Sequence, residues 1–248
     1  MPNTQRHNKE GYFPGIMTER TELRPLPGWL PKEQEIISHF AKTARYSNYK
    51  LTLVKYLSTL LPESGECTLL DVGAGDGRLS SFFQRYRPAT QGVGIETFLR
   101  HSTQRSIPMV LFDGKSLPFV DGAFDVSMIC DVLHHTKNQK ELIAEVFRVT
   151  RRKVLVKDHL YRNMKQKYQL YVLDLLGNYR FGIRVTGDYL SLPQWEHLLS
   201  SKRVESLSLF QDVPVRKPPL SYLFTNSVEV LFEINLKQTP ELPNKNES

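Results

Sequence analysis

One segment, residues 69–79, constrains the fold of this 248-residue chain more than any other. It reads Leu-Leu-Asp-Val-Gly-Ala-Gly-Asp-Gly-Arg-Leu, so an apolar run passes through an acid and three alternating glycines into a helical pattern. This order predicts a strand, a tight turn and the start of a helix. Alternating glycines let a ligand approach the backbone and permit turn dihedrals that other residues resist. The segment therefore predicts a nucleotide-like ligand across the turn, at the carboxyl edge of a parallel sheet.

Apolar runs and helical patterns alternate through the middle of the chain. The runs predict strands at 68–72, 92–96, 109–112, 124–130 and 154–157. The patterns between them predict helices at 78–85, 98–104 and 139–149. Such an order is typical of a parallel sheet with helices on both faces. Two later runs, at 204–209 and 228–234, add further strands and bring the expected sheet to seven.

The flanking regions carry a different pattern. Residues 1–62 predict an irregular stretch to residue 30 and then two amphipathic helices, which either cap the ligand crevice or simply pack on the sheet edge. The second helix has one apolar stripe and is stopped by Pro62. We expect the core domain to span 63–237. Within it, residues 159–200 form a lid insertion after the fifth strand, with helices ending near Gly177 and at 193–200. The polar tail, 238–248, is expected to be disordered.

Composition excludes several classes of protein. Hydrophobic residues make up 40% of the chain and charged residues 24%, which is typical of globular proteins. We find no apolar stretch near the roughly 18 residues that cross a bilayer, and no secretory signal pattern at the N-terminus. Cys67 and Cys130 lie in apolar runs, which favours buried thiols in a reducing compartment. We therefore expect a cytoplasmic protein without membrane insertion.

The net charge of +7 permits an anionic partner. The basic clusters, however, lie near the C-termini of two predicted helices, where cations complement the helix dipole. A solvated basic surface is therefore favoured over a nucleic-acid patch.

The glycine turn lacks the signatures of phosphate-binding loops. A dinucleotide fingerprint needs its third glycine where this chain has Arg78, and a phosphate loop ends in Gly-Lys-Ser/Thr. A diphosphate would also meet the Asp76 carboxylate, which is electrostatically unfavourable. The turn therefore favours a ligand without phosphates, and a cationic one.

Four acids stand at the ends of four successive predicted strands: Asp71, Glu96, Asp113 and Asp131. Glu96 lies about 20 residues beyond the turn, where an acid accepts hydrogen bonds from ribose hydroxyls. Asp113 is placed to accept from an adenine amino group. Each acid alone could be a helix cap or a loop residue, but the set favours a positively charged nucleoside.

Taken in order, the segments 69–79, 94–96, 112–119, 124–130, 131–135 and 145–149 resemble class I S-adenosylmethionine-dependent methyltransferases. The resemblance covers about residues 50–157 and is strongest to the branch that modifies small molecules. It implies a Rossmann-like, doubly wound, mainly parallel seven-stranded sheet. It also implies S-adenosylmethionine as the cofactor and S-adenosylhomocysteine as the product.

The same resemblance implies roles for individual residues. Gly73, Ala74, Gly75 and Gly77 would pass beneath the methionine part of the cofactor, and Asp71 would help to hold its ammonium group. The end of the second strand, Glu96 and Thr97, would take the ribose hydroxyls. Asp113 and Gly114 would meet the adenine, and the backbone of Cys130 and Asp131 would line the floor near the sulfonium.

Methyl transfer from a sulfonium is an in-line displacement, for which the protein mainly positions the nucleophile. A base is needed only when the nucleophile arrives protonated. His134 and His135 are the catalytic candidates, since either could accept a proton near neutral pH; the alternative is that they orient a loop or cap the next helix. No third residue shows suitable ligand spacing, so we expect no metal.

The acceptor site is expected just beyond the fifth strand, from Lys157, Asp158, His159, Tyr161 and Arg162. We therefore predict methyl transfer to a small-molecule acceptor at O, N or C. One alternative is an RNA or protein acceptor, although no nucleic-acid-binding motif is visible. Others are a non-catalytic cofactor-binding protein and, remotely, an NAD-dependent oxidoreductase.

Overall fold

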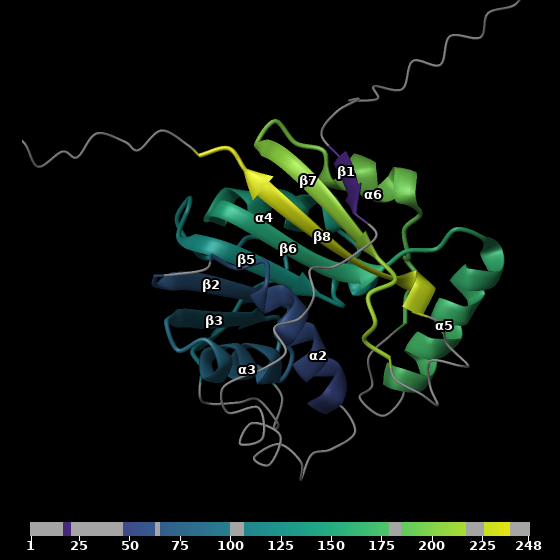
Figure 1. Cartoon of the computed structure of the whole chain (residues 1–248), viewed down its shortest axis with the longest axis horizontal. Helices are drawn as coiled ribbons and strands as arrows, with labels where there is room; N and C mark the ends of the chain where they lie inside the picture. Colours follow the sequence, from purple (N-terminus) through teal and green to yellow (C-terminus); the bar gives the residue numbers. More distant parts are fainter. Residues whose placement is uncertain are drawn as a thin grey trace, which may run out of the picture.

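A computed structural model describes residues 17–20, 47–62, 65–99, 107–178, 185–216 and 226–238. Its centre is an eight-stranded sheet in the order β1-β7-β8-β6-β5-β2-β3-β4 (Figure 1). The strands are β1 (Met17–Arg20), β2 (Cys67–Val72), β3 (Thr90–Glu96), β4 (Met109–Leu111), β5 (Phe124–Cys130), β6 (Thr150–His159), β7 (Val204–Gln211) and β8 (Glu229–Leu236).

One strand of this sheet, β8, runs against the others. β4, β3, β2, β5 and β6 are parallel neighbours, whereas β8 is antiparallel to both β6 and β7. After β1 at one edge, the chain enters the middle of the sheet at β2, runs outward through β3 and β4, and then crosses back to β5 on the other side of β2. The carboxyl ends of β2 and β5 therefore form a topological switch point, where open α/β sheets bind their ligands.

The α-helices are α2 (Ser47–Ser58), α3 (Arg78–Tyr86), α4 (Gln139–Val149), α5 (Met164–Asn178) and α6 (Leu192–Leu199), with short 3-10 turns η2 (Leu133–His135) and η4 (Asn226–Val228). Side chains alternate across the sheet, so neighbouring residues enter different cores. Leu69 packs with α2 and α3, whereas Leu70 packs with α4 and α6. Helices thus cover both faces, as the alternation of apolar runs predicts.

The seven expected strands are present. The strand predicted at 124–130 coincides with β5, and the helix predicted at 139–149 coincides with α4. The expectation of an irregular stretch to residue 30 is wrong for β1, which pairs in parallel with β7 at the sheet edge. Backbone pairing with a distant strand supports this segment, and its four residues carry no local strand pattern. Residues 97–99 are not helical. The remainder of the predicted 98–104 helix, the first N-terminal helix and the tail from 239 lie outside the described residues.

Among the described residues we find no helix with the length and apolar character that crossing a membrane requires.

Candidate functional site

The turn after β2 is built on three glycines in the left-handed region. Gly73, Gly75 and Gly77 have φ of 71°, 61° and 72°, a conformation that costs an L side chain about 1–2 kcal/mol. At Gly73 a Cβ would also lie 2.9 Å from Cγ1 of Val132, and closer still to its Cγ2. The Gly77 N–H closes the turn on the Ala74 carbonyl at 2.9 Å, and α3 begins at the next residue. The predicted strand, turn and helix are therefore confirmed.

Glu96 folds back from the end of β3 onto this turn. Its Oε1 accepts the Gly75 N–H at 2.7 Å and its Oε2 accepts the Thr97 N–H at 3.0 Å, and the residue is only 8% exposed. Each carboxylate oxygen has two lone pairs, so each can accept a further hydroxyl. The Gly75 amide, which a phosphate loop would direct at its ligand, is instead committed to a carboxylate.

Asp71 lies one residue before the end of β2 and is buried. Its Oδ2 accepts the Ser80 hydroxyl at 2.6 Å, which joins β2 to the first turn of α3. Burial raises the pKa of Asp71 to about 6. The side chain thus faces the sheet–helix interface, behind the turn.

Two further acids border the turn. Asp76 is paired with Lys50 of α2 at 2.9 Å and accepts the Arg78 N–H at 3.1 Å. Asp113 is exposed, and its Oδ1 accepts the N–H groups of Lys115 and Ser116 at 2.8 and 3.0 Å, which lowers the pKa of its carboxyl. A Cβ on the next residue, Gly114, would lie 3.4 Å from the Thr97 side chain, so the ends of β3 and β4 meet here.

Asp131 follows β5 with a left-handed φ of 57°, unusual for a residue with a side chain. Its Oδ2 accepts the Tyr49 hydroxyl at 2.6 Å, and its Oδ1 pairs with Lys157 Nζ. Lys157 is completely buried and lies 2.6 Å from Glu229, which also pairs with Arg216. Although burial lowers it, the pKa of Lys157 is held well above its usual value by Asp131 and Glu229. We call Tyr49, Asp131, Lys157, Arg216 and Glu229 the lysine cluster.

The two catalytic candidates differ in protonation. His134 is buried, with Nδ1 2.5 Å from Asp158 Oδ1. Although burial disfavours its charge, Asp158 and Asp174 raise the pKa of His134 to about 10, so it is a cation at neutral pH. Burial and the His134 charge lower the pKa of His135, which is neutral. His134 is therefore unsuited to accept a proton.

The residues expected to contact an acceptor are more deeply buried than residues that line an open crevice. Lys157 and Asp158 have no exposed surface, because β8 pairs along β6 and their charges are met by carboxylates and histidines. His159 lies between Asp158 and Glu229, at 3.2 and 3.4 Å. Tyr161 approaches Gln194 of α6, and Arg162 binds Ser227 and Gln211. These side chains hold the insertion against the sheet.

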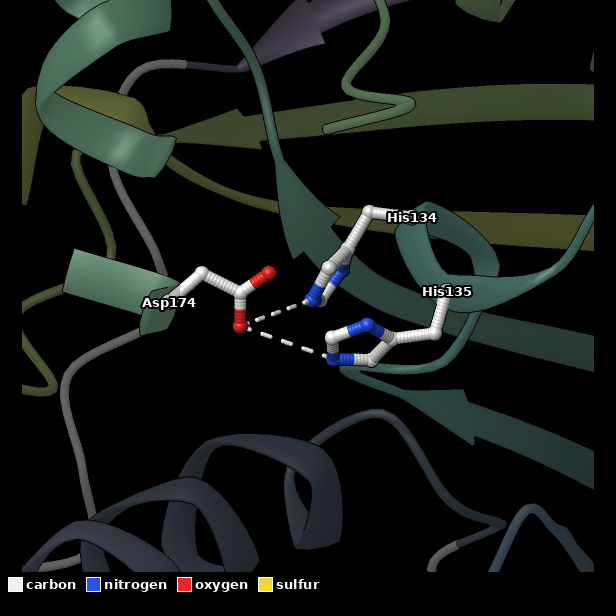
Figure 2. A group of neighbouring side chains, drawn as sticks. All are labelled: His134, His135 and Asp174. Atoms are coloured by element: carbon white, nitrogen blue, oxygen red, sulfur yellow. Dashed lines mark ion pairs between the residues drawn. The ribbon is translucent and has the colours of Figure 1, made fainter. Parts of the chain in front are cut away.

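Tyr49 and Glu229 were not identified from the sequence, and Asp174 and Tyr189 were placed only in the insertion after the fifth strand. Asp174 lies on α5, yet its Oδ1 is 3.5 Å from His135 Nε2 and 3.8 Å from His134 Nε2 (Figure 2). Its Oδ2 accepts the Tyr189 hydroxyl at 2.9 Å. Glu229 gave a signal as an acid within the apolar run of β8, and Tyr189 as an aromatic residue of the insertion.

Residues 70–156 match the family model described as a methyltransferase domain. An uncharacterized protein of Methanocaldococcus jannaschii is 29% identical over 115 residues, 41% of this chain and 53% of that protein. An uncharacterized methyltransferase of Mycobacterium sp. (strain JLS) is 36% identical over 92 residues, 35% of this chain and 36% of that protein. The matched part thus spans about half or less of these relatives.

Solved structures share the fold. An S-adenosylmethionine-dependent methyltransferase of Thermotoga maritima aligns with a TM-score of 0.56 at 14% identity, over 82% of this chain and 99% of that one. A phosphoethanolamine N-methyltransferase of Haemonchus contortus, solved with S-adenosylhomocysteine, aligns with a TM-score of 0.56 at 14% identity, over 77% of this chain and 53% of that one. Residues 70–156 thus match a methyltransferase domain, and the sheet order and glycine turn agree with the fold of class I S-adenosylmethionine-dependent methyltransferases.

Proposed function

We propose that this protein transfers the methyl group of S-adenosylmethionine to a small-molecule acceptor. One observation carries the cofactor part of this proposal: the Glu96 carboxylate accepts a hydrogen bond from the Gly75 amide, in a turn that would face a phosphate in phosphate-binding loops. A negative charge at this point repels a diphosphate and favours a ribose whose nucleoside carries positive charge.

The residues at the switch point fit such a cofactor. Its ribose would lie at Glu96 and Thr97, its adenine at Asp113 and Gly114, and its methionine part over the glycine turn. The Cys130–Asp131 backbone would form the floor beneath the sulfonium. When bound, the cofactor supplies a methyl group already activated by the sulfonium charge.

The chain's own contribution to the reaction is positioning. The N-terminal end of α2 reaches over the switch point, where Tyr49 binds Asp131 and Lys50 binds Asp76. These two contacts support a capping role for the region before residue 62, which would shield the site from water. His134 lies between two carboxylates and thereby orients the loop after β5, while the nucleophile itself need only be brought into line.

The acceptor is proposed to bind beside the insertion after β6. A cavity of about 220 Å³ lies there, lined by Met164, Lys167, Tyr168, Tyr171, Gly187 and Tyr189. Tyr189 forms a wall of this cavity and also binds Asp174, so the cavity adjoins the histidine pair. Aromatic walls with one lysine suit a flat or anionic small molecule.

Calorimetry with S-adenosylhomocysteine tests the cofactor assignment. Glu96→Gln loses a charge-assisted hydrogen-bond acceptor, worth about 1.5–3 kcal/mol, and should bind about 10- to 100-fold more weakly. Glu141→Gln, an exposed acid at the start of α4, is the matched control and should bind like the wild type. No binding of S-adenosylhomocysteine by the folded wild type, or tighter binding of NAD, would reject the proposal.

Incubation with methyl-labelled cofactor and fractionated cell extract then identifies the acceptor. Label in a low-molecular-weight fraction supports the proposed acceptor class. Label found only in RNA or protein would refute it.

A further inference from the structure

Three ligand-type atoms converge between η2 and α5: Nε2 of His134, Nε2 of His135 and Oδ1 of Asp174. Figure 2 shows both imidazole rings directed at the same carboxylate oxygen, at 3.8 and 3.5 Å. The groups come from segments about forty residues apart, so the fold alone brings them together. Their side chains are 4%, 21% and 9% exposed.

The spacing of these atoms suits a shared cation better than direct hydrogen bonds. N–H···O hydrogen bonds span about 2.7–3.2 Å, which both distances exceed. Two ligands on one metal ion, each about 2.0–2.2 Å from it, lie about 3–3.5 Å apart. The His135 distance falls within that range and the His134 distance requires a shift of only a few tenths of an ångström.

Supporting groups already orient two of the three ligands. The Asp158 carboxylate lies 2.5 Å from Nδ1 of His134. Such a carboxylate–histidine pair fixes the orientation of an imidazole ring that binds a metal through its other nitrogen. Asp158 is itself held by the Leu133 N–H at 3.0 Å, and Asp174 is held by the Tyr189 hydroxyl at 2.9 Å.

His135 provides a separate indication that a group is missing. Its Nδ1 is buried and has no hydrogen-bond partner among the described residues. Buried polar atoms are nearly always satisfied, so this atom indicates a bound water beside the ring. A metal ion on Nε2 would not contact Nδ1, and such a water would act by orienting the ring.

We propose that His134, His135 and Asp174 bind one divalent first-row transition-metal ion. Two imidazoles and one carboxylate form a mixed nitrogen and oxygen set that suits Zn²⁺, Mn²⁺ or Fe²⁺. On binding, the Nε2 proton of His134 leaves to solvent and the metal takes its lone pair. Three protein ligands leave coordination positions open, and such an ion polarises an acceptor hydroxyl and makes it easier to deprotonate.

Two other groups of metal-ligand residues occur in the described part of the chain, and both are already committed. One includes Asp131 and Glu229, whose carboxylates are paired with Lys157. The other relies on Asp158, which is hydrogen-bonded to His134. In the group on α5 and η2, both distances from the carboxylate to a histidine exceed a hydrogen bond, and this carboxylate is not paired with a lysine or arginine in the described part of the chain.

The test uses the full chain without an affinity tag, stripped with EDTA and titrated with Co²⁺ and then Zn²⁺. We expect one equivalent of Co²⁺ to bind with visible d–d absorption, and Zn²⁺ to displace it. His135→Gln and Asp174→Asn should each weaken binding about tenfold or more. The matched controls, His197→Gln on α6 and Asp188→Asn, change exposed residues of the same types and should leave the affinity unchanged.

Several outcomes overturn the inference. One is a folded wild-type protein, judged by circular dichroism, that binds no stoichiometric Co²⁺. Another is binding that neither ligand variant weakens, which would place the ion elsewhere. Because no cofactor is added, the result is independent of the proposed methyl transfer. Protein that binds Co²⁺ but not S-adenosylhomocysteine would refute the proposed function and keep the metal site.

Discussion

Replacing Lys157 with methionine tests the strongest electrostatic feature of the structure. Lys157 has no exposed surface, and its ammonium group is matched by Asp131 and Glu229. Methionine has similar length and no charge, so Lys157→Met leaves the packing volume nearly intact. It also leaves the lysine cluster with two carboxylates facing the single guanidinium of Arg216.

Removing one partner of a buried ion pair costs about 3–5 kcal/mol, because the remaining charge stays in a low-dielectric site. For a chain of this size each kcal/mol lowers Tm by about 2–4 °C, so Lys157→Met should lose about 6–20 °C. Adding Glu229→Gln to the same chain removes one of the two carboxylates and restores the balance of charges in the lysine cluster. We expect the double variant to be less destabilised than the sum of the two single variants.

Urea unfolding of the wild type, Lys157→Met and Lys153→Met provides the measurement. Lys153 lies on the same strand and pairs with Glu233 at 2.5 Å, but its side chain is 20% exposed. Because this pair retains contact with solvent, its replacement should cost less than that of Lys157. Equal losses for the two lysine variants would show that burial of the charge contributes nothing measurable and would refute the reasoning.

Two further substitutions address the turn behind the site. Gly73→Ala combines a left-handed φ of 71° with a clash against Val132, so it should lower the free energy of unfolding by more than the roughly 1–2 kcal/mol of backbone strain. In urea, Gly73→Ala/Val132→Ala should recover part of that loss, and no recovery would contradict the proposed contact. The pKa of Asp71 is raised to about 6, so its protonated form favours folding, and the apo protein should lose up to about 3 kcal/mol as pH rises from 4 to above 6. Asp71→Asn should lack this component, and an unchanged difference between variant and wild type across those pH values would count against it.

Local patterns were sufficient for the strand, turn and helix around the glycines. An apolar run before alternating glycines leaves little choice of backbone, and Glu96 could be placed because parallel strands align their carboxyl ends. The same reasoning could not find Asp174. Its approach to the histidine pair depends on how α5 docks after β6, which residue spacing in the chain does not encode.

Burial of Lys157 was also beyond the sequence. Three consecutive ionisable residues at a strand end, here Lys157-Asp158-His159, normally indicate side chains exposed to solvent. Only the antiparallel pairing of β8 with β6 places Glu229 opposite His159. Tertiary pairing likewise decided β1, whose residues gain their hydrogen bonds from β7 and not from any local preference.

Side chains alternate between the two faces of the sheet at the end of β6, so neighbouring residues contact α2 on one face and the insertion on the other. Lys157 points to the face where Leu155 packs with α2, and it reaches Tyr49 on that helix. Asp158 points to the opposite face and holds His134, which faces Asp174 of α5. Adjacent residues thus tie the N-terminal helix to one side of the sheet and the insertion to the other. His159 contacts both Asp158 and Glu229, so the two networks meet at this residue. Lys157→Met should nevertheless loosen α2 more than it weakens metal binding by the histidine pair, and Asp174→Asn should do the reverse.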